Sequence, residues 1–257
     1  MQVKILGSGS SLGVPMIGCC CSVCSSGNPK NRRMRQSIFL QENKTKILID
    51  CGSDVRRQIL SNKIGGVDGI LITHAHSDHT GGLDEIRSFC LHWKKTINLY
   101  MNESTYDDLR KKFSYILSME LDIEGKKLPV VKVNIIKPGQ KYKIGEISFE
   151  AFEQDHADIK SLGFKFESFA YSTDFYNIDP ESLKNLKGIE MWIVECLGYE
   201  KPVKKKSHIR LDRVLELIKE VGPKRAVLVH MSHEIDCSDP SKKLPKNVVL
   251  GYDGMDL

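Results

Sequence analysis

The sequence predicts one α/β domain over residues 1–257, and three observations carry that prediction. Short apolar runs rich in β-branched and aromatic residues alternate with amphipathic stretches. No long segment rich in Pro, Gly or Ser separates one part of the chain from another. Several apolar runs also end on His or Asp, and the carboxyl ends of strands are where α/β folds build their sites.

Seven runs are expected to be strands, because each is short, apolar and bounded by Gly, Pro, Asn or charged residues. In chain order they are TKILID, DGILIT, INLYM, ISFEAF, FAYSTD, MWIVEC and RAVLVH, at residues 45–50, 68–73, 97–101, 147–152, 169–174, 191–196 and 225–230. Five strand ends carry a polar residue that can bind a metal ion: Asp50, His74, His156, Asp174 and His230.

Two stretches between these runs are expected to be helices. Residues 104–117 open with Ser104 as the N-cap. Residues 211–221 end before Gly222 and Pro223, and their apolar side chains are expected on one face. The residues of that face are Leu211, Val214, Leu215, Ile218 and Val221.

The composition favours a soluble, cytoplasmic protein. Hydrophobic residues make up 40% of the chain, and no apolar run approaches the roughly 18 residues of a membrane helix. We expect no membrane association and no secretory signal. The net charge of +5 is small, and its densest basic run, residues 201–210, is interpreted either as a solvated face or as an attraction for an anionic substrate.

Four of the eight cysteines lie in the run GCCCSVC, residues 18–24. Persistent disulfides are rare in a reducing compartment, and cysteines one or two positions apart reach bridging geometry only under strain. A metal site is therefore the favoured interpretation of this run.

The run THAHSDHTGG, residues 73–82, has the densest chemistry in the chain. It places His74, His76, Asp78 and His79 directly after an apolar strand. His74 and His76 can face the same side, because side chains alternate along extended backbone. Imidazole and carboxylate donors in this number suit Zn, Fe or Mn.

This pattern resembles the H-x-H-x-D-H signature of the metallo-β-lactamase superfamily, and the resemblance covers essentially the whole chain. It implies a four-layer αββα sandwich with two divalent cations, Mn or Zn, at one rim. It implies that Asp174 bridges the cations and that Asp50 orients their ligands. The implied ligands are His74, His76 and His156 for one cation, and Asp78, His79 and His230 for the other. His76 argues against the diiron flavoprotein branch, which usually has Glu there.

A second metal site is predicted from the cysteine run. Cys19, Cys21 and Cys24 form C-x-C-x-x-C, and His233 would complete a Cys₃His set of the kind that holds structural zinc. A register in which Cys20 replaces Cys19 or Cys21 stays open. The tract resembles the PhnP-type phosphodiesterases, in which such a zinc pins the N-terminal loop beside the active site. The similarity extends to GSGSSLGVP, HMSHE and GYDGMDL, and it places the knuckle at residues 18–35.

The expected activity is hydrolysis of a small phosphodiester, with cyclic phosphates as one candidate class. Two neighbouring cations would share a hydroxide nucleophile at neutral pH. The expected catalytic residues are His208, Asp78 and Asp50. His208 would protonate the leaving alkoxide, since it is not needed as a ligand and PhnP-type enzymes place a histidine of that role there. The alternative for His208 is a helix-capping surface residue.

Three other functions stay open. A tRNase Z-like RNA endonuclease shares the fold and metal set, but residues 103–129 look too short and too helical for its tRNA arm. A thioester hydrolase of the glyoxalase II kind would leave the knuckle and His208 unexplained. A metal-stabilised nucleic-acid binder would need more aromatic residues than the 7% present. A nucleic-acid partner is thus less favoured than a small phosphodiester, and a homodimer is left open.

Overall fold

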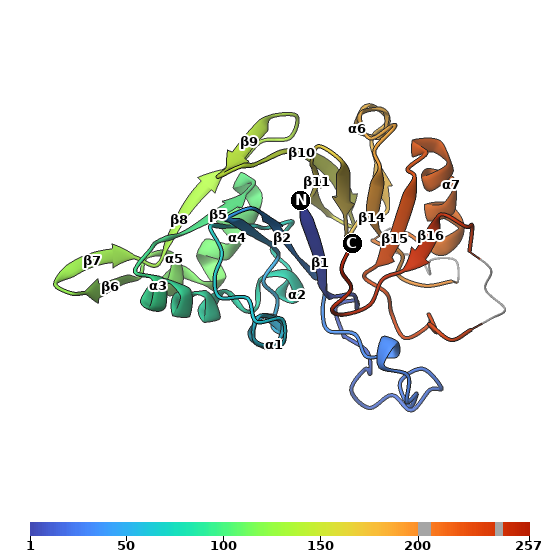
Figure 1. The fold of residues 1–257 in the computed structure, drawn as a ribbon, viewed down its shortest axis with the longest axis horizontal. Coiled ribbons are helices and arrows are strands. Elements are labelled where there is room, and N and C mark those ends of the chain that lie inside the picture. The colour runs from blue at the N-terminus through green and yellow to red at the C-terminus, as the bar shows by residue number, and fades with distance from the viewer. Residues whose placement is uncertain (200–206, 240–243) are drawn as a thin grey trace.

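The computed structural model describes residues 1–199, 207–239 and 244–257 (Figure 1). Most of the basic run noted above, residues 201–206, lies outside the described residues. Two β-sheets face each other, and helices cover the outer face of each sheet. This arrangement confirms the predicted αββα sandwich. No helix in the described part is long and apolar enough to cross a bilayer.

The first sheet has the strand order β1-β2-β3-β4-β5-β8. Its strands are β1 (Gln2–Gly7), β2 (Ser37–Glu42), β3 (Thr45–Ile49), β4 (Gly69–Leu71), β5 (Ile97–Met101) and β8 (Val131–Ile135). Its helices are α1 (Val55–Ser61), α2 (Ser77–Thr80), α3 (Arg87–Trp93), α4 (Glu103–Lys112) and α5 (Ser114–Leu117). Because β3, β4, β5 and β8 run parallel, their carboxyl ends meet at one edge.

The second sheet has the order β13-β10-β11-β12-β14-β15-β16, with β9 paired to β10. Its strands are β9 (Lys141–Ile144), β10 (Ile147–His156), β11 (Ile159–Lys165), β12 (Phe169–Ser172), β13 (Asn177–Ile178), β14 (Met191–Glu195), β15 (Arg225–Val229) and β16 (Val248–Leu250). Its helices are α6 (Pro180–Asn185) and α7 (Leu211–Val221). In this sheet β12, β14, β15 and β16 run parallel to one another, so their carboxyl ends also share one edge.

The two faces of each sheet pack into different cores, because successive side chains on a strand point to opposite faces. In β3, Ile47 and Ile49 belong to the core between the sheets, whereas Leu48 belongs to the core under the first set of helices. In β14, Ile193 faces the other sheet, while Trp192 packs in the core that contains α7. Each fully buried side chain of this kind contributes about 1.5–3 kcal/mol.

The segment from 103 to 129 differs from its prediction. The N-cap of α4 is Asn102, whose Oδ1 accepts the Thr105 N–H at 2.9 Å, so Ser104 lies inside the first turn. The segment is also not helical throughout. Its second half is a hairpin of β6 (Glu120–Ile123) and β7 (Lys126–Pro129), which projects from the molecule in Figure 1.

Helix α7 ends where the sequence predicts, since Gly222 adopts the left-handed conformation with φ 69° and caps it. Its buried face differs from the prediction at three positions. Leu217 is buried, whereas Leu211 and Leu215 are only partly buried. The buried residues Val214, Leu217, Ile218 and Val221 follow the i, i+3, i+4, i+7 spacing of one helix face.

Candidate active site

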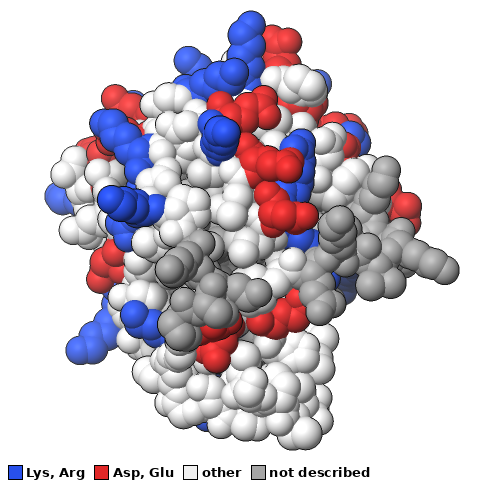
Figure 2. Space-filling view, turned by 90° about the vertical axis from the view of Figure 1, so that its right-hand side faces the viewer, with Lys and Arg blue, Asp and Glu red and all other residues white. Residues whose placement is uncertain are grey.

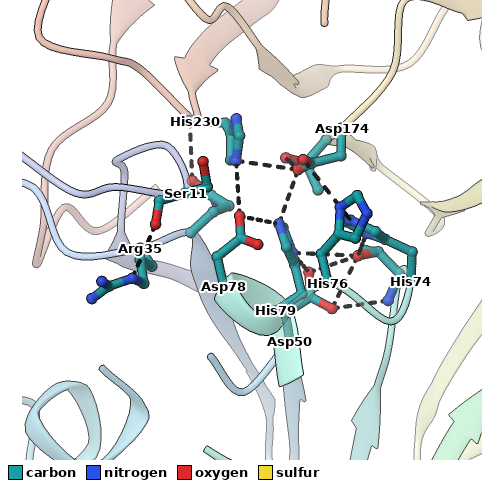
Figure 3. Close-up of polar contacts among 12 residues, drawn as sticks. Ser11, Arg35, Asp50, His74, His76, Asp78, His79, Asp174 and His230 are labelled. Atoms are coloured by element: carbon teal, nitrogen blue, oxygen red, sulfur yellow. Dashed lines mark hydrogen bonds and ion pairs between the residues drawn. The ribbon is translucent and has the colours of Figure 1, made fainter. Parts of the chain in front are cut away.

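The five polar strand ends converge where the rims of the two sheets meet, and Figure 3 shows Asp50, His74, Asp174 and His230 there. Asp50 follows β3 and the loop carrying His74 follows β4, both in the first sheet. His156 ends β10, Asp174 lies two residues beyond β12, and His230 follows β15, all in the second sheet. All five residues are buried. The sandwich therefore concentrates imidazoles and carboxylates from distant parts of the chain in one place.

Three of these residues have an unusual backbone. Asp50, Asp174 and His230 adopt left-handed conformations with φ of 61°, 54° and 53°. Such a conformation costs a non-glycine residue on the order of 1–3 kcal/mol and persists where the surrounding structure enforces it. Strained residues of this kind cluster at functional sites, which agrees with a functional role for this rim.

One group of ring nitrogens comes from three histidines. His74 Nε2 lies 2.9 Å from His76 Nδ1, and His156 Nε2 lies 3.3 Å from the same atom. The far nitrogens of two of these rings are held in place: His74 Nδ1 contacts Thr73 Oγ1 at 3.0 Å, and His156 Nδ1 donates to the Ser207 carbonyl at 2.7 Å. Both Nε2 atoms are therefore directed at a common point that a cation could occupy.

A second group lies beside the first. The short helix α2 carries Asp78 and His79, with His79 Nε2 3.1 Å from Asp78 Oδ2. His230 Nε2 lies 3.6 Å from the same carboxylate oxygen. Gly52 allows the loop after β3 to pack directly on α2, since a Cβ at this position would lie 1.8 Å from the Asp78 carbonyl oxygen.

Asp174 lies between the two groups and offers a different oxygen to each. Its Oδ1 is 3.7 Å from His156 Nε2 and 4.0 Å from His74 Nε2. Its Oδ2 is 3.0 Å from His79 Nε2 and 3.3 Å from His230 Nε2. A carboxylate placed in this way can bridge two neighbouring cations.

Asp50 fixes the ring of His79 from behind. Asp50 Oδ2 accepts the His79 Nδ1–H at 2.7 Å, and Asp50 Oδ1 accepts the Thr73 N–H at 2.8 Å. Nε2 is therefore the ring atom of His79 that a cation would bind. Among the described residues, the buried Nε2 atoms of His79 and His230 have no hydrogen-bond partner. Unpartnered ring nitrogens facing carboxylates fit a site for divalent cations.

The electrostatics of the cluster agree with that fit. Burial alone would raise the pKa of Asp174, but His230 and His79 hold it well below its usual range. Burial would lower the pKa of His230, but Asp174, Asp78 and Glu195 raise it to about 10. Protons on the imidazoles thus balance the buried carboxylates, and divalent cations would replace those protons.

Glu195, at the end of β14, is a site residue that the sequence analysis missed. It is fully buried, its Oε1 lies 2.5 Å from His208 Nδ1 and 3.3 Å from His230 Nδ1, and its Oε2 accepts the Phe175 N–H at 2.9 Å. Burial would lower the pKa of His208, but the charge of Glu195 raises it. The available signal was an acidic residue at the end of the apolar run MWIVE, the same pattern as at the other five strand ends.

His208 itself reaches the rim and does not cap α7 with its side chain. Its ring stacks on His230 with centroids 5.3 Å apart and meets His156 edge-on at 4.9 Å. Its Nδ1 is 3.8 Å from Asp174 Oδ1. With Nδ1 held by Glu195, Nε2 is the ring atom left for a substrate.

The predicted zinc knuckle brings its four residues together. His233 Nδ1 lies 3.2 Å from Cys19 Sγ, 3.5 Å from Cys21 Sγ and 3.6 Å from Cys24 Sγ. Tetrahedral zinc with bonds of about 2.3 Å to sulfur and about 2.0 Å to nitrogen would separate such atoms by about 3.5 Å. The four residues therefore fit a zinc ion. Cys20 is exposed and is not part of the group, and none of the cysteines in the described ranges forms a disulfide.

Thiol pKa values in the knuckle are perturbed in opposite directions. The Cys24 N–H, donated to Cys21 Sγ, is the main cause that lowers the pKa of Cys21 to about 6. Burial raises the pKa of Cys24 to about 11. A thiolate at Cys21 would be ready to bind a metal, because the thiolate is the form that coordinates.

Buried polar groups attach the knuckle to the loop after β15. The guanidinium of Arg33 donates to the Ser232 carbonyl at 2.9 Å and to the Ile235 carbonyl at 2.7 Å. Asn31 donates to Asp236 at 2.8 Å. Since His230 and His233 lie on this same stretch, the knuckle and the rim share one support.

The closing run GYDGMDL supports the glycine-rich loop near the N-terminus. Asp253 accepts the N–H and hydroxyl of Ser8 at 2.9 and 2.8 Å and the Met34 N–H at 2.7 Å. Burial raises the pKa of Asp253 to about 6. The loop continues to Ser11, which lies beside Asp78 and His230 in Figure 3.

The chain is similar to known proteins both in sequence and in structure. The family described as "Beta-lactamase superfamily domain" matches residues 45–231. A crystal structure described as a new diphosphatase from the PhnP family superposes with a TM-score of 0.90 at 30% identity, covering 100% of this chain and 96% of that one.

Two relatives identified by sequence are longer proteins. An octanoyltransferase of Porphyromonas gingivalis is 32% identical over 258 residues, which cover 100% of this chain and 51% of that protein. A ribonuclease Z of Bradyrhizobium is 26% identical over 151 residues, covering 56% of this chain and 48% of that enzyme. The matches thus span about half the length of these relatives.

Proposed function

This chain belongs to the metallo-β-lactamase superfamily, in its PhnP family, and is a metal-dependent hydrolase; from that premise we propose that it hydrolyses a small phosphodiester, with cyclic phosphates as the first class to test. One observation carries the proposal: Asp174 offers one oxygen to each of two adjacent groups of ligands. A phosphate ester needs positive charge at more than one oxygen as it reacts, and adjacent cation positions meet that need.

Two divalent cations, Mn or Zn, would activate water as a nucleophile and neutralise charge on the phosphate oxygens. His74, His76 and His156 would hold one cation, and Asp78, His79 and His230 the other, with Asp174 between them. Asp50 would keep His79 in the tautomer that leaves Nε2 free, through the contact of 2.7 Å to its Nδ1.

His208 would act as the general acid. Glu195 Oε1 accepts the hydrogen bond from the Nδ1–H of His208. The second proton of the imidazolium is therefore on Nε2, from which it can pass to the leaving oxygen. The buried negative charge of Glu195 favours the protonated ring. Glu195 is then the residue that orients the acid and stabilises its charge.

Cys19, Cys21, Cys24 and His233 would hold a structural zinc. That ion would complete a small rigid unit within one domain of residues 1–257 and keep the loop after β15 in place. The similar proteins include a diphosphatase and a ribonuclease Z, two enzymes whose names place their reactions at phosphate groups, and this supports the proposed reaction type.

Turnover of bis(p-nitrophenyl) phosphate by the metal-free chain reloaded with Mn²⁺ or Zn²⁺ tests the proposal. A cyclic nucleotide, a precursor tRNA and an octanoyl thioester are run beside it. The proposal predicts metal-dependent cleavage of the diester and the cyclic phosphate. Cleavage of the precursor tRNA or of the thioester, with both small phosphodiesters left intact, would show that it is wrong.

A further inference from the structure

The three left-handed residues of the active-site rim, Asp50, Asp174 and His230, differ from the other residues with this backbone. Among the described residues, eight that are not glycine have φ between 50° and 61°. The three at the rim are buried, whereas the other five are exposed. Water can solvate the backbone of an exposed turn, but a buried backbone group needs a partner inside the protein. The exposed five are Asn43, Lys63, Lys94, Glu124 and Ala157.

Ser161 supplies such a partner for Asp174. Its hydroxyl, on β11, donates to the Asp174 carbonyl oxygen at 2.7 Å. The Nε2–H group of Gln154, on β10, donates to Ser161 Oγ at 3.1 Å and to the Thr173 carbonyl at 3.0 Å. Both side chains are fully buried. Because the Ser161 oxygen accepts from Gln154, its own proton is left for Asp174.

Two adjacent residues at the start of β2 hold the backbone of the other two. Gln36 Oε1 accepts the His230 N–H at 3.2 Å. The Ser37 hydroxyl lies 2.9 Å from the Asp50 carbonyl oxygen and 3.0 Å from that of Ile49. Gln36 and Ser37 are both buried. One short segment therefore contacts a left-handed rim residue from each of the two sheets.

We propose that Gln36, Ser37 and Ser161 are positioning residues for the two cations, and this inference rests on the proposed pair of cations. Each contacts the backbone of a left-handed rim residue and not a metal-binding atom. Figure 3 shows the side chains of all three rim residues gathered around His79. Since φ sets the direction in which a side chain leaves the backbone, release of the strained conformation would turn a ligand or its support away from the site.

The three positioning residues should affect the two cations differently. Asp174 offers one oxygen to each group of ligands, so loss of the Ser161 hydroxyl should weaken the binding of both cations. Gln36 and Ser37 act on the group formed by α2 and the loop after β15. Their loss should weaken one cation and spare the other. A general loss of stability would not separate the two cations in this way.

Titration of the full chain with Mn²⁺ tests this inference. The chain first receives one equivalent of Zn²⁺ for the knuckle, because thiolate ligands favour zinc. Electron paramagnetic resonance then measures free Mn²⁺. Ser161→Ala should lower the affinity for both Mn²⁺ ions about 10-fold, and Gln36→Leu and Ser37→Ala should lower it for one ion only. Circular dichroism shows which variants are folded, and three separate positions keep the test open if one variant does not fold.

Ser172→Ala is the matched control. Ser172, on β12, is as deeply buried as Ser161, but its hydroxyl oxygen accepts the Trp192 Nε1–H at 3.0 Å. The control removes a buried hydrogen bond without touching a rim residue, so both affinities should stay within about 3-fold of the wild type. None of these changes alters the surface charge, which on the face in Figure 2 consists of Lys and Arg interspersed with Asp and Glu. Attraction of cations from solution therefore stays the same.

Two results would overturn the inference directly. One is a folded Ser161→Ala variant with both affinities within about 3-fold of the wild type, and the other is an equal loss of affinity in Ser172→Ala. A wild type that binds no Mn²⁺ at the rim would overturn the inference and the proposed function together. Two bound Mn²⁺ ions without diester hydrolysis would refute the proposed activity alone, because these affinities are measured without a substrate.

Discussion

Replacement of Glu195 by Gln tests the proposal that His208 is a general acid supported by this carboxylate. The carboxylate is fully buried and contacts His208 Nδ1 at 2.5 Å. Glutamine keeps the shape and an oxygen that can accept the Nδ1–H, but it removes the negative charge. A hydrogen bond to a charged group is worth about 1.5–3 kcal/mol, so kcat for a diester with an alkoxide leaving group should fall about 10- to 150-fold.

The assay compares two leaving groups and records a pH profile. A p-nitrophenolate departs without a proton, so its release should change less than about 3-fold. A general acid works only while protonated, so activity falls as pH rises through its pKa. Because the charge of Glu195 raises the pKa of His208, the Gln variant should lose activity at lower pH than the wild type. His208→Ala should show the same dependence on the leaving group.

Metal content is the control for this variant. Glu195 Oε1 also lies 3.3 Å from His230 Nδ1, so a damaged cation site would lower both rates together. Equal losses for the two leaving groups would contradict the proposed role of Glu195, as would an alkyl diester rate within about 3-fold of the wild type.

Three further predictions concern the supports of the site. Cys21→Ser should bind one fewer zinc per chain by elemental analysis while the catalytic cations still load; loss of all metal together would contradict separate sites. Asp253→Asn should remove a pH dependence of the free energy of unfolding. The pKa of Asp253 is raised to about 6, so its ionisation should cost the folded wild type about 2 kcal/mol as pH rises from about 4 to about 6. Chemical denaturation at several pH values in that range measures the free energy of unfolding. If this assignment is wrong, the free energy of unfolding will change with pH by the same amount in the two proteins. Gly52→Ala should lower the free energy of unfolding by more than about 2 kcal/mol, because its Cβ would meet the Asp78 carbonyl oxygen at 1.8 Å. Gly27→Ala, with open space around it, is the control and should change stability by less than about 0.5 kcal/mol.

The polar residues at the rim could be predicted from the sequence because each of them lies at the end of an apolar run. Asp50, His74 and His230 each follow an apolar run directly, and parallel strands bring such ends to one edge. Glu195 follows the same rule and was missed, since an acid before a cysteine has no motif to mark it. Its role depends on contacts to His208 and His230, which are distant in sequence.

Other features depend on packing that no local pattern encodes. Asn102 and Ser104 are both good N-cap residues; in the structure the backbone is still extended at Asn102, and its side chain accepts the Thr105 N–H. The burial of Leu217 in place of Leu215 follows from how α7 is rotated on its sheet. The hairpin of β6 and β7 has charged residues at many positions, so its alternation is weak in the sequence.

We propose that two cations bind side by side with Asp174 between them. Crystals of the Mn²⁺-loaded chain, measured at the manganese absorption edge, test it most directly. We expect two anomalous peaks about 3.5–4 Å apart, one beside His74, His76 and His156 and the other beside Asp78, His79 and His230. A single peak in the fully loaded protein, or a pair with Asp174 bound to neither ion, would contradict it.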